Sequence, residues 1–287
     1  MFLLRAVVVG LARTTDFIVN ETLPSNPATA PAKPAINYHD RTIRLNPPKN
    51  ALNKCLRGLF DWFERRVAGV SVNPDLHVYD NQTFPWAAEV EADWKLVRAE
   101  LDQVMKFRDQ MPSFQDILKE VGNIQTDDQW KTFFLMGIGM DCTDNAARCP
   151  ETMRVLQKIP GVKTAFFSIL SPKKHIPAHR GAFNGVLRLH LALMVPEPRE
   201  QVRIRIGNDF YNWTEGKVLI FDDTYNHEVW NDTDGYRVVL FVDFARPLKS
   251  PWNRLLNGVL NMASLAPFLR EAGMKQKKWE KKMGEKR

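Results

Sequence analysis

The chain has 287 residues, of which 44% are hydrophobic and 25% are charged, and it contains three cysteines. This is the composition of an ordinary globular protein, and it excludes a wholly disordered chain, a collagen, a polytopic membrane protein and a disulfide-held scaffold. The net charge of +7 lies in residues 249–287, which carry ten lysines and arginines against three glutamates. The rest of the chain balances at 30 basic and 30 acidic residues, so we do not expect a polyanion-binding body.

The first residues, Met1–Leu11, form an apolar run that is too short to span a bilayer and is interrupted by Arg5. No small-residue cleavage site follows convincingly, so we expect no secretory signal. The run predicts a short helix packed on the body, with a shallow membrane contact as the alternative. Four prolines within residues 21–35 then indicate a linker or an extended surface arm.

Two stretches of the N-terminal half have the apolar spacing of helices, residues 50–68 and about 86–108. Residues 113–135 are expected to be helical or irregular. Residues 1–75 are therefore predicted to form an N-terminal helical and extended region that includes the proline-rich arm.

From about residue 162 the hydrophobic period changes from helical to alternating. The clearest strand is Val186–Met194, in which four leucines point to one side while Arg188 and His190 point to the other. Turn signals containing glycine, asparagine and aspartate separate the strands. The five predicted strands are Lys163–Leu170, Val186–Met194, Val202–Ile206, Lys217–Phe221 and Tyr236–Phe244.

Many short strands at this spacing are typical of an antiparallel sandwich or jelly roll. We therefore predict a mainly β fold with flanking helices. The central domain is expected at residues 76–248, with its β core at about 162–247, and a basic amphipathic tail is expected at 249–287.

Histidines are concentrated in the predicted β region, where four of the six are found: His175, His179, His190 and His227. Oxygen-activating iron sites commonly use two histidines and one carboxylate, written H-x-D/E early in the sheet with a second histidine late in it. Here His179 begins such a motif and His227 follows late, but Gly181 occupies the carboxylate position. Spacing alone leaves a metal site and structural histidines both open. His175 is expected in a loop or at the rim of the pocket, with metal ligation as the alternative.

Arg188 and His190 share the polar face of a strand whose other face is leucine. An arginine that faces the interior needs an anionic partner. A dicarboxylate cosubstrate would supply one, because a guanidinium binds a carboxylate bidentately, and Arg237 could bind the second carboxylate. The alternative for each arginine is a structural salt bridge or a solvated barrel mouth.

Two acidic residues, Asp222 and Asp223, follow a buried strand and are expected to cap the turn there, with metal ligation as the alternative. Cys142 and Cys149 enclose a short loop, and we expect thiols in a reducing compartment and a disulfide in an oxidising one. No CxxC motif is present, so we expect no zinc site.

Five segments together resemble the aspartyl/asparaginyl β-hydroxylase family: His179–Gly181, Leu187–Leu191, Trp213–Asp223, His227–Trp230 and Arg237. The resemblance covers about residues 75–247. It implies a double-stranded β-helix core, which is a cupin-like jelly roll. It also implies a dioxygenase that uses Fe(II), 2-oxoglutarate and O2 to hydroxylate an unactivated C–H bond.

The resemblance implies a role for the two histidines of the motif. His179 and His227 match the two iron ligands. Because Gly181 stands at the third position, water can complete the iron site, as it can in family members that share this glycine.

The resemblance also implies a binding site for 2-oxoglutarate. Arg237 and Ser168 match the residues that bind its distal carboxylate. Arg188 and His190 match the pair that holds its C1-carboxylate end.

The substrate class follows from smaller features. Cys149–Pro150 followed by a helix, and the segment Ile159–Lys163, resemble the bacterial branch that hydroxylates acyl chains of lipid A or ornithine lipids. Val186 stands where peptide hydroxylases carry an arginine, which disfavours an acidic peptide. We expect a lipid acyl chain as substrate. The alternatives are Asp or Asn in a peptide, a free amino acid, and a non-catalytic jelly roll that binds a carboxylate.

The tail combines apolar residues such as Leu256 and Leu260 with a lysine cluster that follows them. Such a segment can lie on an anionic membrane surface, and a helix packed on the body is the alternative. Nucleic-acid binding is not expected, because aromatic groups are scarce among the lysines. We expect a cytoplasmic protein that contacts the inner face of the membrane through this tail.

Overall fold

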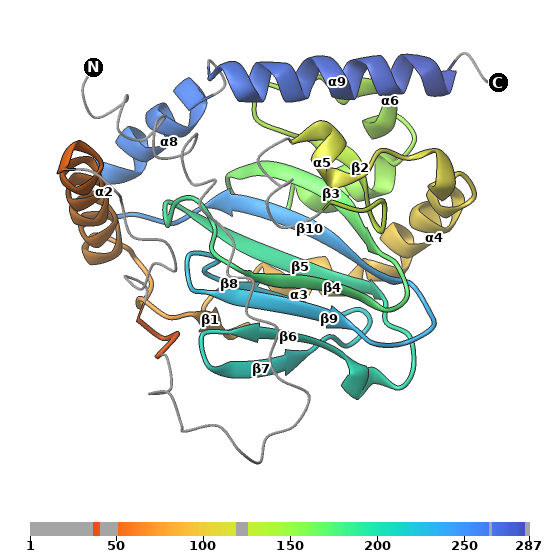
Figure 1. Ribbon diagram of the computed structural model, residues 1–287, viewed down its shortest axis with the longest axis horizontal. Coiled ribbons are helices and arrows are strands. Elements are labelled where there is room, and N and C mark those ends of the chain that lie inside the picture. Colours follow the sequence, from red (N-terminus) through yellow and green to blue (C-terminus); the bar gives the residue numbers. More distant parts are fainter. Residues whose placement is uncertain (1–36, 41–50, 119–125, 264–265, 285–287) are drawn as a thin grey trace.

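Two antiparallel β-sheets form the centre of the computed structural model, which describes residues 37–40, 51–118, 126–263 and 266–284 (Figure 1). The larger sheet runs β1 (Val78–Tyr79), β8 (Val218–Phe221), β5 (Val186–Met194), β10 (Arg237–Ala245), β3 (Val162–Leu170) and β2 (Trp130–Met136). The smaller sheet runs β4 (Lys174–His179), β9 (His227–Asn231), β6 (Val202–Ile206) and β7 (Asp209–Asn212). This arrangement confirms the predicted jelly roll with flanking helices.

One face of the larger sheet is covered by helices. The four leucines of β5 belong to a core cluster that also contains residues of α3 (Ala87–Ala92), α4 (Trp94–Met105) and α7 (Pro150–Leu156). Side chains on the opposite face of the sheet, such as Phe166 and Phe241, pack with Ile204 and Val229 of the smaller sheet. The alternation of β5 therefore directs its polar residues into the space between the sheets, as the sequence predicts.

All five predicted strands are present with ends within one residue of those expected. The region 113–135 is a correction, because α5 (Phe114–Ile117) is followed there by β2, which pairs with β3. Six of the seven residues of β2 are buried, so both of its faces are covered. A strand buried on both faces has no alternating pattern, which is why its sequence does not resemble a half-exposed strand.

The predicted helix at 50–68 is confirmed as α2 (Ala51–Gly69), and the one at 86–108 is divided into α3 and α4. Met1–Leu11 and the proline-rich arm at 21–35 lie outside the described residues.

All three cysteines are free thiols, and burial raises the pKa of Cys142 and of Cys149 to about 12. The remaining short helices are η1 (Arg108–Gln110), α6 (Thr143–Ala146) and η3 (Arg199–Gln201).

The tail forms α8 (Trp252–Ala263) and α9 (Pro267–Gly284), and both helices pack on the body (Figure 1). Leu256 and Leu260 of α8 are buried in a cluster with Val67 of α2. On α9, the Trp279 Nε1–H donates to the Gln110 carbonyl at 2.9 Å. The packed-helix alternative therefore holds for Leu256 and Leu260, while other apolar residues of α8 are exposed. Within the described part of the chain, no helix combines the length and the apolar character needed to cross a bilayer.

Glu280 gives a stability prediction for the docking of α9. Its carboxylate is 2% exposed, accepts from the Asn145 N–H at 3.3 Å, and burial raises its pKa above the ordinary 4.5. An acid with a raised folded-state pKa contributes stability below its unfolded pKa, and that contribution is lost as pH rises through the folded pKa. We expect Glu280→Gln to be more stable than wild type at about pH 8 and to lose this advantage near pH 4, as measured by urea unfolding.

The matched control for this prediction is Glu271→Gln on the same helix, whose side chain is 41% exposed. This variant should show no pH-dependent gain. A Glu280→Gln chain that is less stable than wild type at pH 8 would contradict the prediction.

Candidate active site

His179 and His227 lie opposite each other on adjacent antiparallel strands. They are register partners of β4 and β9, and their ring centroids are 4.1 Å apart. His179 is the last residue of its strand and His227 is the first of its own, so both side chains stand at one end of the smaller sheet. The pairing brings together two residues that are 48 positions apart in the sequence.

Backbone carbonyls determine which ring nitrogen of each histidine is protonated. His179 Nδ1 lies 2.8 Å from the Pro177 carbonyl, and His227 Nδ1 lies 2.9 Å from the Tyr225 carbonyl. A carbonyl only accepts, so Nδ1 carries the proton and Nε2 keeps its lone pair. Burial lowers the pKa of His179 to about 4 and the pKa of His227 well below its usual range. Both rings are therefore neutral at pH 7, as a metal ligand must be.

Arg237 is a buried cation with polar atoms left unpaired. It is 2% exposed, and its Nε and Nη1 have no hydrogen-bond partner among the described residues. Its guanidinium lies 4.7 Å above the ring of Trp213, and burial lowers its pKa to about 9. Burying a charge without a partner is costly, so this site is suited to receive an anion.

His190 and Trp213 extend this unpaired polar cluster. Both ring nitrogens of His190 and the Nε1–H of Trp213 are buried without a partner in the described part of the chain. Burial, then the charges of Arg237 and Arg188, lower the pKa of His190 well below its usual range. A neutral imidazole and an indole beside an unpaired guanidinium offer several donors to one buried anion.

Phe221 connects the unpaired cluster to the histidine pair. Its ring centroid is 5.1 Å from that of His190 and 5.8 Å from that of His227. Ser168 lies on β3 beside β10, is 1% exposed, and accepts a hydrogen bond from Trp130 Nε1–H at 2.9 Å. Because the Ser168 oxygen is the acceptor in that contact, its own hydroxyl proton is left to donate.

Arg188 requires a correction to the argument from sequence. Its guanidinium is paired with Asp223 at 2.8 Å and with Asp243 at 2.9 Å, and it lies 4.1 Å from the Phe241 ring centroid. Asp243 is its register partner on β10. The protein itself therefore neutralises this arginine, and an external anion is not needed to explain its inward position.

Asp223 occupies the space beside Gly181. A Cβ added to Gly181 would lie 2.0 Å from Asp223 Oδ2, and the Gly181 N–H donates to the Asp223 carbonyl at 2.7 Å. Burial raises the pKa of Asp223 to about 7, and its Oδ1 has no hydrogen-bond partner among the described residues. The turn-capping expectation fails for its side chain, whose carboxylate is paired with Arg188.

Asp222 caps the turn as expected, since its Oδ1 accepts from the Thr224 N–H at 3.0 Å. It is also fully buried in an ion pair with Arg246, a partner that the sequence does not reveal.

His175 lies at the surface, paired with Glu228 at 2.7 Å and stacked on Trp230. It is therefore engaged away from the His179–His227 pair.

Sequence reasoning missed two features of this site. They are the position of Trp213 under Arg237 and the pairing of Asp223 with Arg188. The sequence shows Trp213 only as part of a motif, because an isolated tryptophan before a turn does not reveal that it lies under Arg237. Its burial at 2% exposure, with an unpaired N–H, is a signal only the fold provides.

Comparisons with known proteins identify the family. The family described as Aspartyl/Asparaginyl beta-hydroxylase matches residues 91–247, more than half of the chain. An "Ornithine lipid ester-linked acyl 2-hydroxylase" of Rhizobium tropici is 54% identical over 91% of this chain and 95% of that protein. The human "Aspartyl/asparaginyl beta-hydroxylase" is 34% identical over 58% of this chain, which spans 22% of that protein.

Among solved structures, a Pseudomonas putida prolyl-4-hydroxylase has a TM-score of 0.36 and 16% identity, covering 56% of this chain and 98% of that one. This distant likeness carries no information on the reaction. The family expected from the sequence motifs is confirmed by the sequence matches alone. The chain therefore belongs to the aspartyl/asparaginyl β-hydroxylase family of enzymes.

Proposed function

We propose that this chain is an Fe(II)- and 2-oxoglutarate-dependent dioxygenase that hydroxylates a lipid acyl chain. The observation that carries the cosubstrate part is Arg237, a buried guanidinium whose Nε and Nη1 have no partner among the described residues. Phe221 connects its neighbour His190 to His227 of the histidine pair. The relative from Rhizobium tropici, which is named as an acyl 2-hydroxylase of ornithine lipid, supports the lipid part.

The proposal assigns iron to the Nε2 atoms of His179 and His227. Two neutral imidazoles whose Nδ1–H groups are held by carbonyls fit the requirements of a divalent iron site. Gly181 contributes no ligand, so we assign the third position to water. The unpaired Oδ1 of Asp223 is the group that we assign to that water.

The proposal assigns the distal carboxylate of 2-oxoglutarate to Arg237 and the Ser168 hydroxyl. The C1-carboxylate end is assigned to His190 and Arg188. The Nε and Nη2 of Arg188 already bind its two aspartates, so its remaining nitrogen, Nη1, is the one assigned to the cosubstrate. When bound, Fe(II) and 2-oxoglutarate would supply the oxidation of the C–H bond by O2, with succinate and CO2 as co-products. The chain's own part is to orient the cosubstrate, neutralise its charge and exclude water.

An apolar surface beside the site supports a lipid substrate. Arg180, next to His179, forms a buried ion pair with Glu64 of α2 at 2.6 Å. This pair anchors α2 against the loop that follows the first histidine. Val186 packs against the apolar cluster of α2 and α8. An apolar side chain therefore stands at the position where an enzyme for acidic peptides is expected to carry an arginine.

The surface of these two helices, called here the α2–α8 surface, exposes several large apolar side chains. They are Leu59, Trp62, Trp252, Leu255 and Met262. Arg66 is exposed as well, and its guanidinium lies 5.5 Å from the centroid of the Trp62 ring. Apolar groups beside cations suit a surface of anionic lipid, so we propose peripheral contact with the inner leaflet here.

Vesicle binding gives a prediction for this surface. Burying each large side chain contributes about 1.5–3 kcal/mol, so Trp62→Ser combined with Leu255→Ser should weaken binding to phosphatidylglycerol vesicles about tenfold or more. Sedimentation with vesicles measures this, and added salt should weaken the wild-type binding further. Truncation after residue 250 is a poor test, because it removes Leu256 and Leu260 from the core.

The control for vesicle binding is Phe210→Ser on β7, since Phe210 is 59% exposed but does not belong to the α2–α8 surface. It should bind vesicles as wild type does. If wild type, the Trp62→Ser, Leu255→Ser variant and the control all bind vesicles equally, the α2–α8 surface no longer supports a lipid substrate.

The proposed function is tested by supplying the chain with Fe(II), 2-oxoglutarate and O2 together with ornithine lipid. We expect succinate release coupled to a gain of one oxygen mass in an acyl chain. Oxidation of Asp or Asn in a peptide, with unchanged lipid, would instead indicate a peptide hydroxylase. Binding of 2-oxoglutarate without any succinate would indicate a non-catalytic carboxylate-binding protein.

A further inference from the structure

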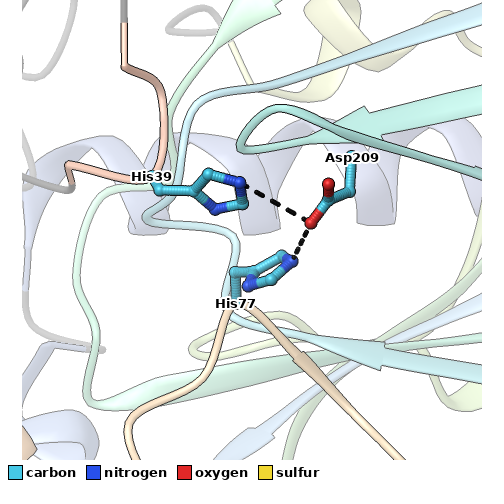
Figure 2. Close-up of side chains that lie close together, drawn as sticks. All are labelled: His39, His77 and Asp209. Carbon is cyan, nitrogen blue, oxygen red and sulfur yellow. Dashed lines mark hydrogen bonds and ion pairs between the residues drawn. The ribbon is translucent and has the colours of Figure 1, made fainter.

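Three side chains from distant parts of the sequence meet outside the proposed iron site: His39, His77 and Asp209 (Figure 2). His39 comes from the short described segment 37–40, His77 precedes β1, and Asp209 begins β7. Asp209 Oδ2 lies 2.9 Å from His77 Nε2 and 3.6 Å from His39 Nε2. Two imidazoles therefore converge on one carboxylate oxygen.

The spacing of these atoms is close to that of a tetrahedral metal site. One ligand atom from each residue lies within 4.8 Å of the other two. Zinc–nitrogen bonds of about 2.0–2.1 Å place tetrahedral ligand atoms about 3.3–3.4 Å apart. The side chains of His39 and Asp209 are 37% and 51% exposed, so small rotations of either can close the remaining gap.

The surrounding structure permits this approach. Gly207 has a φ of +62°, and a Cβ there would lie 2.8 Å from His39 Nδ1, so only glycine lets the ring lie against this turn. His77 is held through its backbone, because its carbonyl accepts from the Asp222 N–H at 3.0 Å, and its ring lies against that of Tyr225, with the centroids 5.8 Å apart. The Tyr211 hydroxyl, which lies 3.1 Å from His77 Nε2, would give up this contact to the ion. One ligand is thus fixed by the sheet while the others can adjust.

We propose that His39, His77 and Asp209 bind a divalent transition-metal ion, with Zn²⁺ as the expected ion and water completing the coordination. Two imidazoles and one carboxylate favour zinc-like ions over Ca²⁺ or Mg²⁺, which prefer oxygen ligands. The absence of a CxxC motif argues only against a cysteine-ligated zinc site, and this set contains no cysteine. The inference does not depend on the proposed function.

Such an ion would tie the segment 37–40 to the β6–β7 hairpin. Further contacts of this segment include the Tyr38 ring, 4.4 Å from the Arg205 guanidinium, and two hydrogen bonds with Asn208, from the Tyr38 N–H to Asn208 Oδ1 at 3.2 Å and from Asn208 Nδ2–H to Asn37 Oδ1 at 3.3 Å. A single neutral hydrogen bond or cation–π contact of this kind contributes modestly to stability. The attachment also lies close to the proposed iron site, because the Tyr225 ring contacts His77 and its carbonyl holds His227.

The test uses the untagged full chain carrying His179→Ala and His227→Ala, so that the proposed iron ligands are absent. Zn²⁺ is the probe, and bound metal is measured by mass spectrometry of the desalted protein. We expect one zinc per chain. Co²⁺ in its place should give the visible absorption of a tetrahedral site.

Adding His39→Ala or Asp209→Asn to the His179→Ala, His227→Ala chain should lower bound zinc to the level of non-specific binding. The matched control is His175→Ala, which removes another histidine paired with a carboxylate, Glu228, and should keep the zinc. If the double variant does not fold, His39→Ala in the otherwise wild-type chain should lower total zinc by one per chain. No zinc in the folded background, or zinc unchanged by both substitutions, would overturn the proposal.

Discussion

Replacing His227 with alanine is expected to reduce iron from about one per chain to background while the protein stays folded. The proposed site has only two protein ligands, so the loss of one leaves a single imidazole, which cannot hold Fe(II) through desalting. The β9 backbone still pairs with β4 and β6, which preserves the sheet. Iron per chain, measured beside the thermal midpoint, decides the outcome, and His179→Ala should behave alike.

Two controls make this result specific. His175→Ala removes a nearby histidine that is engaged by Glu228 and should keep its iron. All variants are compared in a His77→Ala background, because the His39–His77–Asp209 cluster can also hold a dication. Unchanged iron in both His179→Ala and His227→Ala would exclude these residues as ligands.

Arg237→Met should separate cosubstrate binding from folding. Removing one partner of a buried charge pair costs about 2–5 kcal/mol, so the dissociation constant of 2-oxoglutarate should rise by a factor of about 30 to several thousand. Without cosubstrate, the variant should be at least as stable as wild type, because methionine replaces a buried cation whose Nε and Nη1 have no partner among the residues described. Isothermal titration measures binding, and thermal unfolding with and without 2-oxoglutarate measures stability.

A structural role for Arg237 would give the opposite pattern, with lower stability of the free protein and unchanged 2-oxoglutarate affinity. Arg237→Lys should recover binding only in part, because lysine keeps the charge but loses the bidentate fork. Iron binding should be nearly unaffected in both variants, since neither changes a proposed ligand.

The sequence was informative where one face of a strand is buried by leucine and the other is polar. Alternation placed β5 at its correct bounds and oriented Arg188 and His190 together. The same logic failed for β2, because Trp130 and Phe134 are buried on one side of the strand while Phe133 and Leu135 are buried on the other. Periodicity reports the contrast between two environments, and β2 has no such contrast.

The candidate site shows a second limit of sequence reasoning. An inward arginine was correctly expected on β5, but the sequence does not say what faces it. Asp243 is 55 positions away and meets Arg188 only through the register of β5 and β10. Arg237 looks equally charged in the sequence, yet its Nε and Nη1 have no hydrogen-bond partner in the part of the chain that the structure describes. The difference between a paired and an unpaired guanidinium is a property of tertiary contacts.

The contact between Gly181 and Asp223 restricts the order in which substitutions can accumulate. A single change of Gly181 to aspartate would place its Cβ 2.0 Å from Asp223 Oδ2, inside an occupied and buried space. Removing the Asp223 carboxylate first would leave Arg188 with one anionic partner instead of two. A protein-supplied third ligand is therefore separated from the present sequence by an epistatic barrier. Laboratory evolution that samples one position at a time would not cross it, whereas a library that varies both positions together can.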